Sequence, residues 1–225
     1  MTTTLDSVAR SRRLALDGGT IAAFAAAAVA FNIGGALHPN DSGTGNKVTQ
    51  LHAMLLGSTW YAAHLSLLAS FGLFTVAFLR LPGRLELAPA TRRLVRVMAV
   101  VSALTTAAMV PHLLAPLGAE SIADGHANAF SVFMTIDETL VDAPWALGIA
   151  LLALVAGVMR DLGNRITAVA GVVGGVSFAA AAASIPFTDA LDGLFAVGGM
   201  GITIWALSVA GVAAWRRRQT GMTPA

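Results

Sequence analysis

Six long apolar stretches constrain this 225-residue chain more than any other feature. Each approaches the roughly 20 residues that a helix needs to cross the hydrocarbon core of a bilayer, and none contains an internal lysine or arginine. Their apolar residues run continuously, without the alternation that a membrane β-barrel strand requires. The chain is therefore predicted to be a single all-α transmembrane domain over residues 1–225, a six-helix bundle with spans at about 18–37, 59–79, 97–116, 141–159, 166–186 and 194–215.

The composition excludes a soluble globule and several kinds of site. Hydrophobic residues make up 56% of the chain and charged residues 12%, about half the charged fraction of a typical soluble domain. No packing of a chain this size hides so much apolar surface from water. The chain has no cysteine, which rules out disulfides, thiolate metal sites, iron–sulfur clusters and cysteine nucleophiles.

The basic residues predict the orientation of the bundle. Thirteen of the 14 lysines and arginines lie in the N-terminus, the second and fourth loops and the C-terminus, and Lys47 alone lies on the other side. By the positive-inside rule, both termini are predicted to be cytoplasmic. High alanine, glycine and arginine content is typical of a GC-rich bacterial genome, so we expect the bacterial cytoplasmic membrane. The formal net charge is only +2, and no nucleic-acid partner is expected.

The outer loops differ in length and character. Residues 38–50 are rich in turn-forming residues and lack core-forming ones. The third loop, about 117–140, is long and contains an apolar run at 127–136. One helix from His126 to Arg160 would be about 52 Å long, more than a bilayer. We therefore expect a break near Asp137 and a short interfacial helix in this loop, or else a loop with its own hydrophobic contacts.

Small residues recur at four-residue spacing in the fifth span, at Gly171, Gly175, Ala179 and Ala183. Such a face allows two membrane helices to approach closely. It can act inside the bundle, or it can pack against a membrane protein partner or a second copy of the chain.

All five histidines fall in the outer loops or in the outer halves of the spans. His64 lies 16 residues from Arg80, and His112 lies 16 residues from Arg96. At 1.5 Å per residue, both are about 24 Å from the inner surface. Consecutive spans are normally antiparallel neighbours, so the two rings can face each other. Asp142 and Asn32 reach a similar depth by the same counting.

Ionisable residues at this depth are candidates for a functional site. His64, His112 and Asp142 suit a first-row transition metal, with Asn32 as a further ligand or hydrogen-bonding partner. His64 and His112 could instead be axial ligands of haem b, or could handle protons with Asp142 tuning them. A buried neutral histidine that bonds a polar neighbour, or a carbonyl freed by Pro111, needs no ligand at all. A second, more exposed metal site could use His38, His52, His126 and Glu138.

The inner half of the membrane region offers only hydroxyl groups. No charged residue lies near the midplane, which disfavours ion-coupled transporters and proton pumps. No dinucleotide or phosphate-binding motif is present. Prolines near the outer ends of four spans predict a polar pocket that opens outward.

Three functions follow from these observations. The first is a metal- or haem-binding protein, and if it is an enzyme, an oxidoreductase that acts on a lipid-phase substrate such as a quinone. The second is a non-enzymatic membrane subunit or accessory protein. The third is a facilitator for a small neutral solute.

Overall fold

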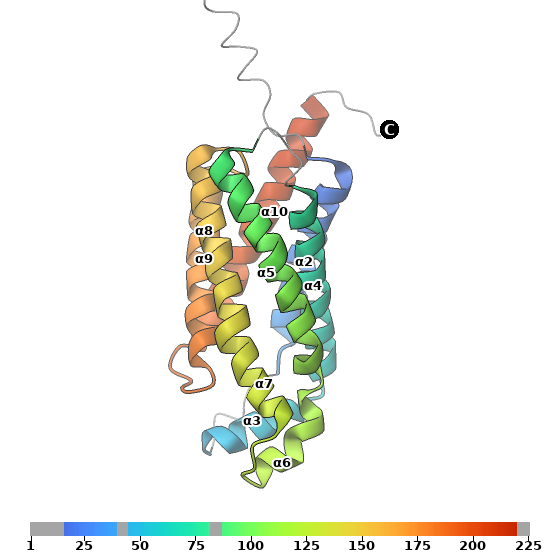
Figure 1. The fold of residues 1–225 in the computed structure, drawn as a ribbon, viewed down its shortest axis with the longest axis vertical. Helices are drawn as coiled ribbons and strands as arrows, with labels where there is room; N and C mark the ends of the chain where they lie inside the picture. Colours follow the sequence, from blue (N-terminus) through green and yellow to red (C-terminus); the bar gives the residue numbers. More distant parts are fainter. Residues whose placement is uncertain (1–15, 40–44, 82–86, 220–225) are drawn as a thin grey trace, which may run out of the picture.

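The computed structural model describes residues 16–39, 45–81 and 87–219, and these residues form helices without any β-strand (Figure 1). Six helical segments of the described residues are long and apolar enough to cross a membrane, which confirms the predicted all-α fold with six potential spans. They are α2 (Gly18–Leu37), α4 (Trp60–Arg80), α5 (Pro89–Leu113), the continuous rod Ala129–Met159, α9 (Arg165–Ser184) and α10 (Gly193–Gln219).

Local sequence signals determine where several of these helices begin and end. The Asp17 side chain accepts a hydrogen bond from the backbone N–H of Thr20 at 2.9 Å and so caps α2. Asn164 caps α9 by accepting from the N–H groups of Ile166 and Thr167. Gly163, with φ of +96°, supplies the left-handed conformation in the short turn between α8 (Ala143–Met159) and α9. Short turns of this kind make successive helices antiparallel.

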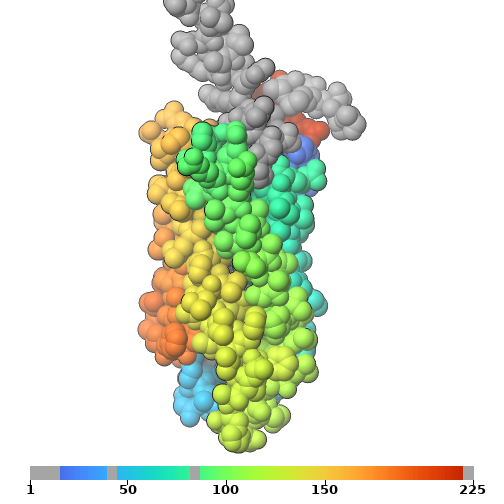
Figure 2. Space-filling view, in the orientation of Figure 1, coloured from blue at the N-terminus to red at the C-terminus, as the bar shows by residue number. Residues whose placement is uncertain are grey.

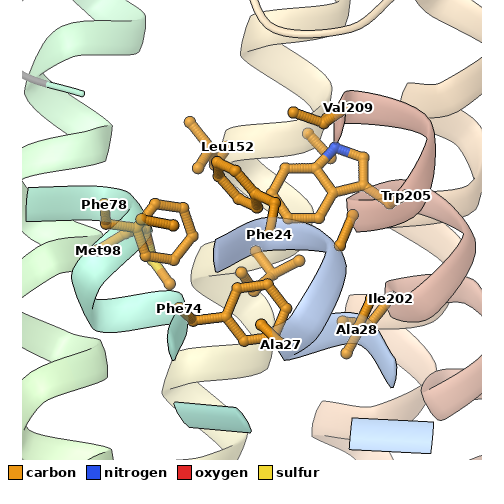
Figure 3. Close-up of a cluster of buried hydrophobic side chains, with 14 of the residues drawn as sticks. Phe24, Ala27, Ala28, Phe74, Phe78, Met98, Leu152, Ile202, Trp205 and Val209 are labelled. Carbon is orange, nitrogen blue, oxygen red and sulfur yellow. The ribbon is translucent and has the colours of Figure 1, made fainter. Parts of the chain in front are cut away.

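The six spans form a closed ring around an aromatic core. Each spanning helix packs against the next one along the chain, and α10 packs against α2. Figure 3 shows part of the core, where Phe24 meets Phe78 and Trp205 edge-on at ring distances of 5.6 and 6.1 Å. Such edge-to-face pairs each add about 0.5–1.5 kcal/mol beyond the burial of their area. Trp145 donates its Nε1–H to Ser102 Oγ at 3.0 Å.

The small residues of α9 pack inside the bundle. A Cβ on Gly174 would lie 2.4 Å from the backbone nitrogen of Ile202 on α10. A Cβ on Gly175 would lie 2.4 Å from the carbonyl oxygen of Ala146 on α8. The glycines thus let α9 touch two neighbours at once, and this face is not available to a separate partner, contrary to one of the expectations above.

The two ends of the ring differ (Figures 1 and 2). One end, here called the basic end, carries the described arginines of the helix termini, Arg80, Arg160, Arg165 and Arg216 to Arg218. Arg10, Arg12, Arg13 and Arg84 lie outside the described residues. The opposite end is covered by a cap, made of α3 (Lys47–Leu55), the 3-10 segment Ala115–Gly118, α6 (Ala119–Ala123) and α7 (Ala129–Asp137).

The cap contains more structure than the sequence indicated. Residues 47–50, which belong to the turn-rich first loop, begin helix α3, because Asn46 caps it by accepting from the N–H of Thr49 at 3.0 Å. Helix α3 packs against α6. A second hydrophobic cluster joins them to the bundle, and its buried members are Leu55, Trp60, Ala115, Ala119, Ile122 and Met134.

The break expected near Asp137 is a π-helical turn instead. Helix α7 continues through residues Glu138–Asp142 into α8 without leaving the helical path. Pro144 has no N–H to donate to the carbonyl of Leu140, and its ring would clash with that carbonyl in a regular α-helix. The wider π turn relieves this conflict. The rod exceeds a bilayer in length because its α7 portion belongs to the cap.

Candidate functional site

Three histidine side chains lie in a row where the ring of spanning helices meets the cap. The ring centre of His64 is 5.0 Å from that of His38 and 5.0 Å from that of His112. The His64 and His112 rings are stacked, with an angle of 28° between their planes. Trp60 stacks on His64 at 3.8 Å. The structure therefore places His64 and His112 in contact across α4 and α5, and adds His38 from the end of α2.

Each of the three rings uses its Nδ1 atom for a hydrogen bond to an oxygen. His64 Nδ1 bonds the carbonyl oxygen of Trp60 at 2.7 Å, and His38 Nδ1 bonds that of Pro39 at 3.1 Å. A carbonyl oxygen can only accept, so Nδ1 carries the hydrogen in both rings. In a neutral imidazole this leaves the lone pair on Nε2, the atom that binds a metal or accepts a proton.

His112 is oriented by a carboxylate. Its Nδ1 lies 2.8 Å from Oδ2 of Asp137, which is fully buried. The two residues come from α5 and α7, so this contact links a spanning helix to the cap. A carboxylate behind a histidine fixes the ring's orientation and raises the basicity of its Nε2.

The helix positions explain why these side chains meet. His64 follows Trp60 by four residues on α4, one helical turn, so its ring reaches back to the Trp60 carbonyl. His112 lies in the last turn of α5, directly after Pro111. The Trp60 indole donates to the carbonyl oxygen of Leu113 at 3.1 Å, which ties α4 to the end of α5 and satisfies a helix-terminal carbonyl.

The cluster is buried beneath the cap. His64 is 1% exposed and His112 is 5% exposed, while His38 is partly buried. Burial and the nearby His112 lower the pKa of His38 to about 4. The prolines suggested a polar pocket that opens to the outside. No such opening reaches these histidines, because Trp60 and the cap cover them.

Two buried carboxylates nearby have unsatisfied oxygens. Oδ1 of Asp137 and Oδ1 of Asp142 are buried and have no hydrogen-bond partner. Asp142, expected to lie beside the histidines, makes no hydrogen bond to His64 or His112, and Asp137 takes that place at His112. An unpaired buried acceptor is costly, so each of these two oxygens is a position where a hydrogen-bond donor or a cation would be stabilising.

Asp137 is the residue that sequence reasoning missed. The expected break put it outside the span, although it ends the apolar run at 127–136. Carrying helical counting through the third loop would have placed it on the same rod as Asp142.

The remaining candidate residues make no hydrogen bond or ring contact with the three histidines, although Glu138 is close enough to His112 to interact with it electrostatically. Asn32 is on the exposed face of α2, and His126 is exposed in the turn between α6 and α7. On α3, Nε2 of His52 lies 3.9 Å from Oε1 of Glu120, and Glu138 is partly buried in the π turn. The structure does not gather them with His38 into a second site.

The arrangement does not fit a haem and does not hold a metal as it stands. Axial imidazoles approach one iron from opposite sides of a porphyrin, whereas His64 and His112 stack closely with Trp60 beside them. Across residues 16–39, 45–81 and 87–219, no group of three or more His, Cys, Asp or Glu is placed to hold a metal ion. The predicted set of His64, His112 and Asp142 stays a prediction.

Comparison with known proteins adds no relative to this description. No protein-family model, no curated protein sequence and no solved structure matches the chain significantly.

Proposed function

We propose that this multi-pass membrane protein binds one divalent first-row transition metal through the Nε2 atoms of His38, His64 and His112. The observation that carries the proposal is that all three neighbouring imidazoles donate Nδ1–H to an oxygen. Histidines that ligate metals almost always donate their other N–H in this way, to a carboxylate or a backbone carbonyl.

The spacing of the rings supports the same ligand set. Imidazoles that bind one zinc ion at 2.0–2.1 Å in tetrahedral geometry have ring centres about 5 Å apart. His64 keeps a distance of 5.0 Å from both His38 and His112. His38 follows the last residue of α2, so a rotation of its side chain can bring its Nε2 toward the other two. The proposal requires this rotation, because no three such side chains among the described residues are placed to hold one metal ion. The rotation gives up the bond from His38 to Pro39, so the Nδ1 bonds kept on metal binding are those of His64 and His112.

The unpaired carboxylate oxygens support a cation at this place. Asp137 is buried beside His112, and a buried carboxylate is expensive to keep ionised unless a positive charge lies nearby. A dication on the neutral imidazoles supplies that charge, with Asp137 one hydrogen bond away through His112. Three protein ligands also leave a fourth position for water or a substrate, as in catalytic zinc sites. Iron or copper in the same ligand set would support the oxidoreductase alternative.

Metal analysis of the purified protein tests the proposal. The protein in detergent is loaded with Zn²⁺ or Co²⁺, freed of excess metal and analysed for bound metal, and for Co²⁺ by its visible absorption spectrum. We expect one bound ion per chain and a spectrum of tetrahedral Co²⁺ with nitrogen ligands. His64→Ala and His112→Ala should abolish binding, and His38→Ala should weaken it.

Matched controls separate this site from loop histidines and from misfolding. His126→Ala removes an exposed loop histidine and should leave metal binding unchanged. His64→Gln keeps side-chain volume, and its thermal unfolding midpoint shows whether the bundle still folds. Equal metal content in His64→Ala and the original chain would overturn the proposal. A folded protein that takes up no metal would also overturn the proposal. If that protein copurified with another chain, the accessory-subunit alternative would be favoured.

A further inference from the structure

A groove runs along the outer side of the bundle between α9 and α10. It has a volume of about 860 Å³, within the range of roughly 300–1,000 Å³ that is typical of ligand pockets. Its walls are apolar apart from one residue, and its lining includes Ile166, Val169 and Val173 of α9 and Val197, Met200 and Ile204 of α10. At the base of the groove, α9 and α10 are in close backbone contact at Gly174 and Gly201.

The groove faces away from the aromatic core. Ile166 is 83% exposed, Val169 is 63% exposed and Met200 is 61% exposed. A continuous apolar surface of this kind marks an interaction site in a protein surrounded by water. On a span of a membrane helix it meets the acyl chains of lipids.

Arg165 is the one charged residue of the lining and is the first residue of α9. It lies at the basic end of the bundle and is exposed. No acidic side chain forms an ion pair with it among the residues that the structure describes. Its guanidinium group presents donors in a fork that matches the oxygens of a phosphate.

We propose that the groove is a binding site for an anionic phospholipid, with an acyl chain along α9 and α10 and the phosphate at Arg165. Charge complementarity selects this occupant over an apolar helix of a partner, because such a helix would leave the arginine without a counter-charge. The site is separate from the histidine cluster and does not depend on metal binding.

Native mass spectrometry of the protein with defined lipids tests this site. The protein in detergent is titrated with phosphatidylglycerol and with phosphatidylcholine of the same acyl chains. We expect phosphatidylglycerol to be retained about fivefold better, the preference that one basic side chain provides at an anionic surface. Arg165→Gln should remove this preference, whereas Arg96→Gln, an exposed arginine of α5 near the same end, should keep it.

A second pair of variants tests the groove itself. Val173→Trp fills the groove and should reduce retention of both lipids, while Val176→Trp, on an exposed part of α9 outside the lining, should not. Equal retention of the two lipids by the original chain would overturn the proposal, and so would equal effects of Arg165→Gln and Arg96→Gln. A dimer that Val173→Trp abolishes, with no lipid preference, would assign the groove to a second copy of the chain instead.

Discussion

At the scale of single residues, Asp137 determines the orientation of the His112 ring. The carboxylate holds Nδ1 of His112 at 2.8 Å and turns the opposite side of the ring away from α7. Counting residues from the arginines predicted the shared depth of His64 and His112, because that depth depends only on helical rise. It did not predict Asp137, because the expected break removed this residue from the counted span.

Replacing Asp137 by Asn tests this orienting role. The amide oxygen can still accept the hydrogen bond, but the negative charge behind the His112 ring is lost. We expect Zn²⁺ affinity to fall about 10- to 100-fold, the usual effect of removing such a partner, with the thermal midpoint nearly unchanged. Competition titration against a chelator measures the affinity. Glu120→Gln, whose side chain is exposed, should leave it unchanged, and a similar loss in that variant would contradict the role.

His38 makes the stability of the metal-free protein depend on pH. Its pKa is lowered from 6.5 to about 4 by burial and by His112, so the unfolded chain binds a proton that the folded chain does not between these pH values. The free energy of unfolding therefore falls as the pH is lowered from about 6.5 to 4. Above this range His38 causes no further change. Thermal unfolding in detergent from pH 4 to 8 measures the effect, and His38→Asn should reduce the slope. An unchanged slope in that variant would assign the dependence to another group.

At the scale of elements, the glycines of α9 determine how close the helices come. Gly174 lies against the backbone of α10, and Gly175 lies against the backbone of α8. The spacing of small residues predicted a close packing face. It did not show that the neighbours are helices of the same chain, because a face pattern carries no information on which helix covers it.

A methyl group on Gly174 should destabilise the bundle. Its Cβ would lie 2.4 Å from the backbone nitrogen of Ile202, and backbone cannot move aside as a flexible side chain can. Gly174→Ala should cost about 1–3 kcal/mol of stability, as overpacking does. Gly211→Ala is the control, because no neighbour lies within 4 Å of its Cβ, and better helix propensity should make it neutral or stabilising by up to about 1 kcal/mol. Thermal midpoints in one detergent compare the two variants, and equal midpoints would exclude the steric effect.

The spanning helices and the short helix α7 of the third loop were predictable, whereas α3 and the π turn were not. Apolar length alone locates α2 at 18–37 in both prediction and structure, since the bilayer thickness fixes the requirement. The π turn depends on a local conflict at Pro144, and α3 depends on a cap at Asn46 and on packing against α6. Such features arise from tertiary contacts, which a hydropathy pattern does not contain.

At the scale of the whole molecule, the two ends of the ring have different charge and shape. The described arginines of the helix termini gather at the basic end, and the cap closes the other (Figure 1). This polarity is the basis for expecting the basic end, with the end of α10, in the cytoplasm.

Cysteine labelling tests the orientation directly, because the chain contains no cysteine of its own. Ala123→Cys lies on an exposed position of the cap, and Gln219→Cys lies at the exposed end of α10. A membrane-impermeant maleimide should label the first in intact spheroplasts and the second only after permeabilisation. Ala28→Cys, which is buried, should stay unlabelled in both. The reverse pattern would place the termini outside.

The attachment of α3 has a kinetic consequence. Lys47 of α3 forms an ion pair with Asp189 in the turn between α9 and α10, and both side chains are more than a third exposed to solvent. Ion pairs of this kind contribute at most about 1 kcal/mol and are screened by salt. Because the hydrophobic cluster around Leu55 also holds α3 on the cap, high ionic strength should loosen only the Lys47 end of the helix, and the rate at which solutes reach the buried histidines should depend only weakly on salt.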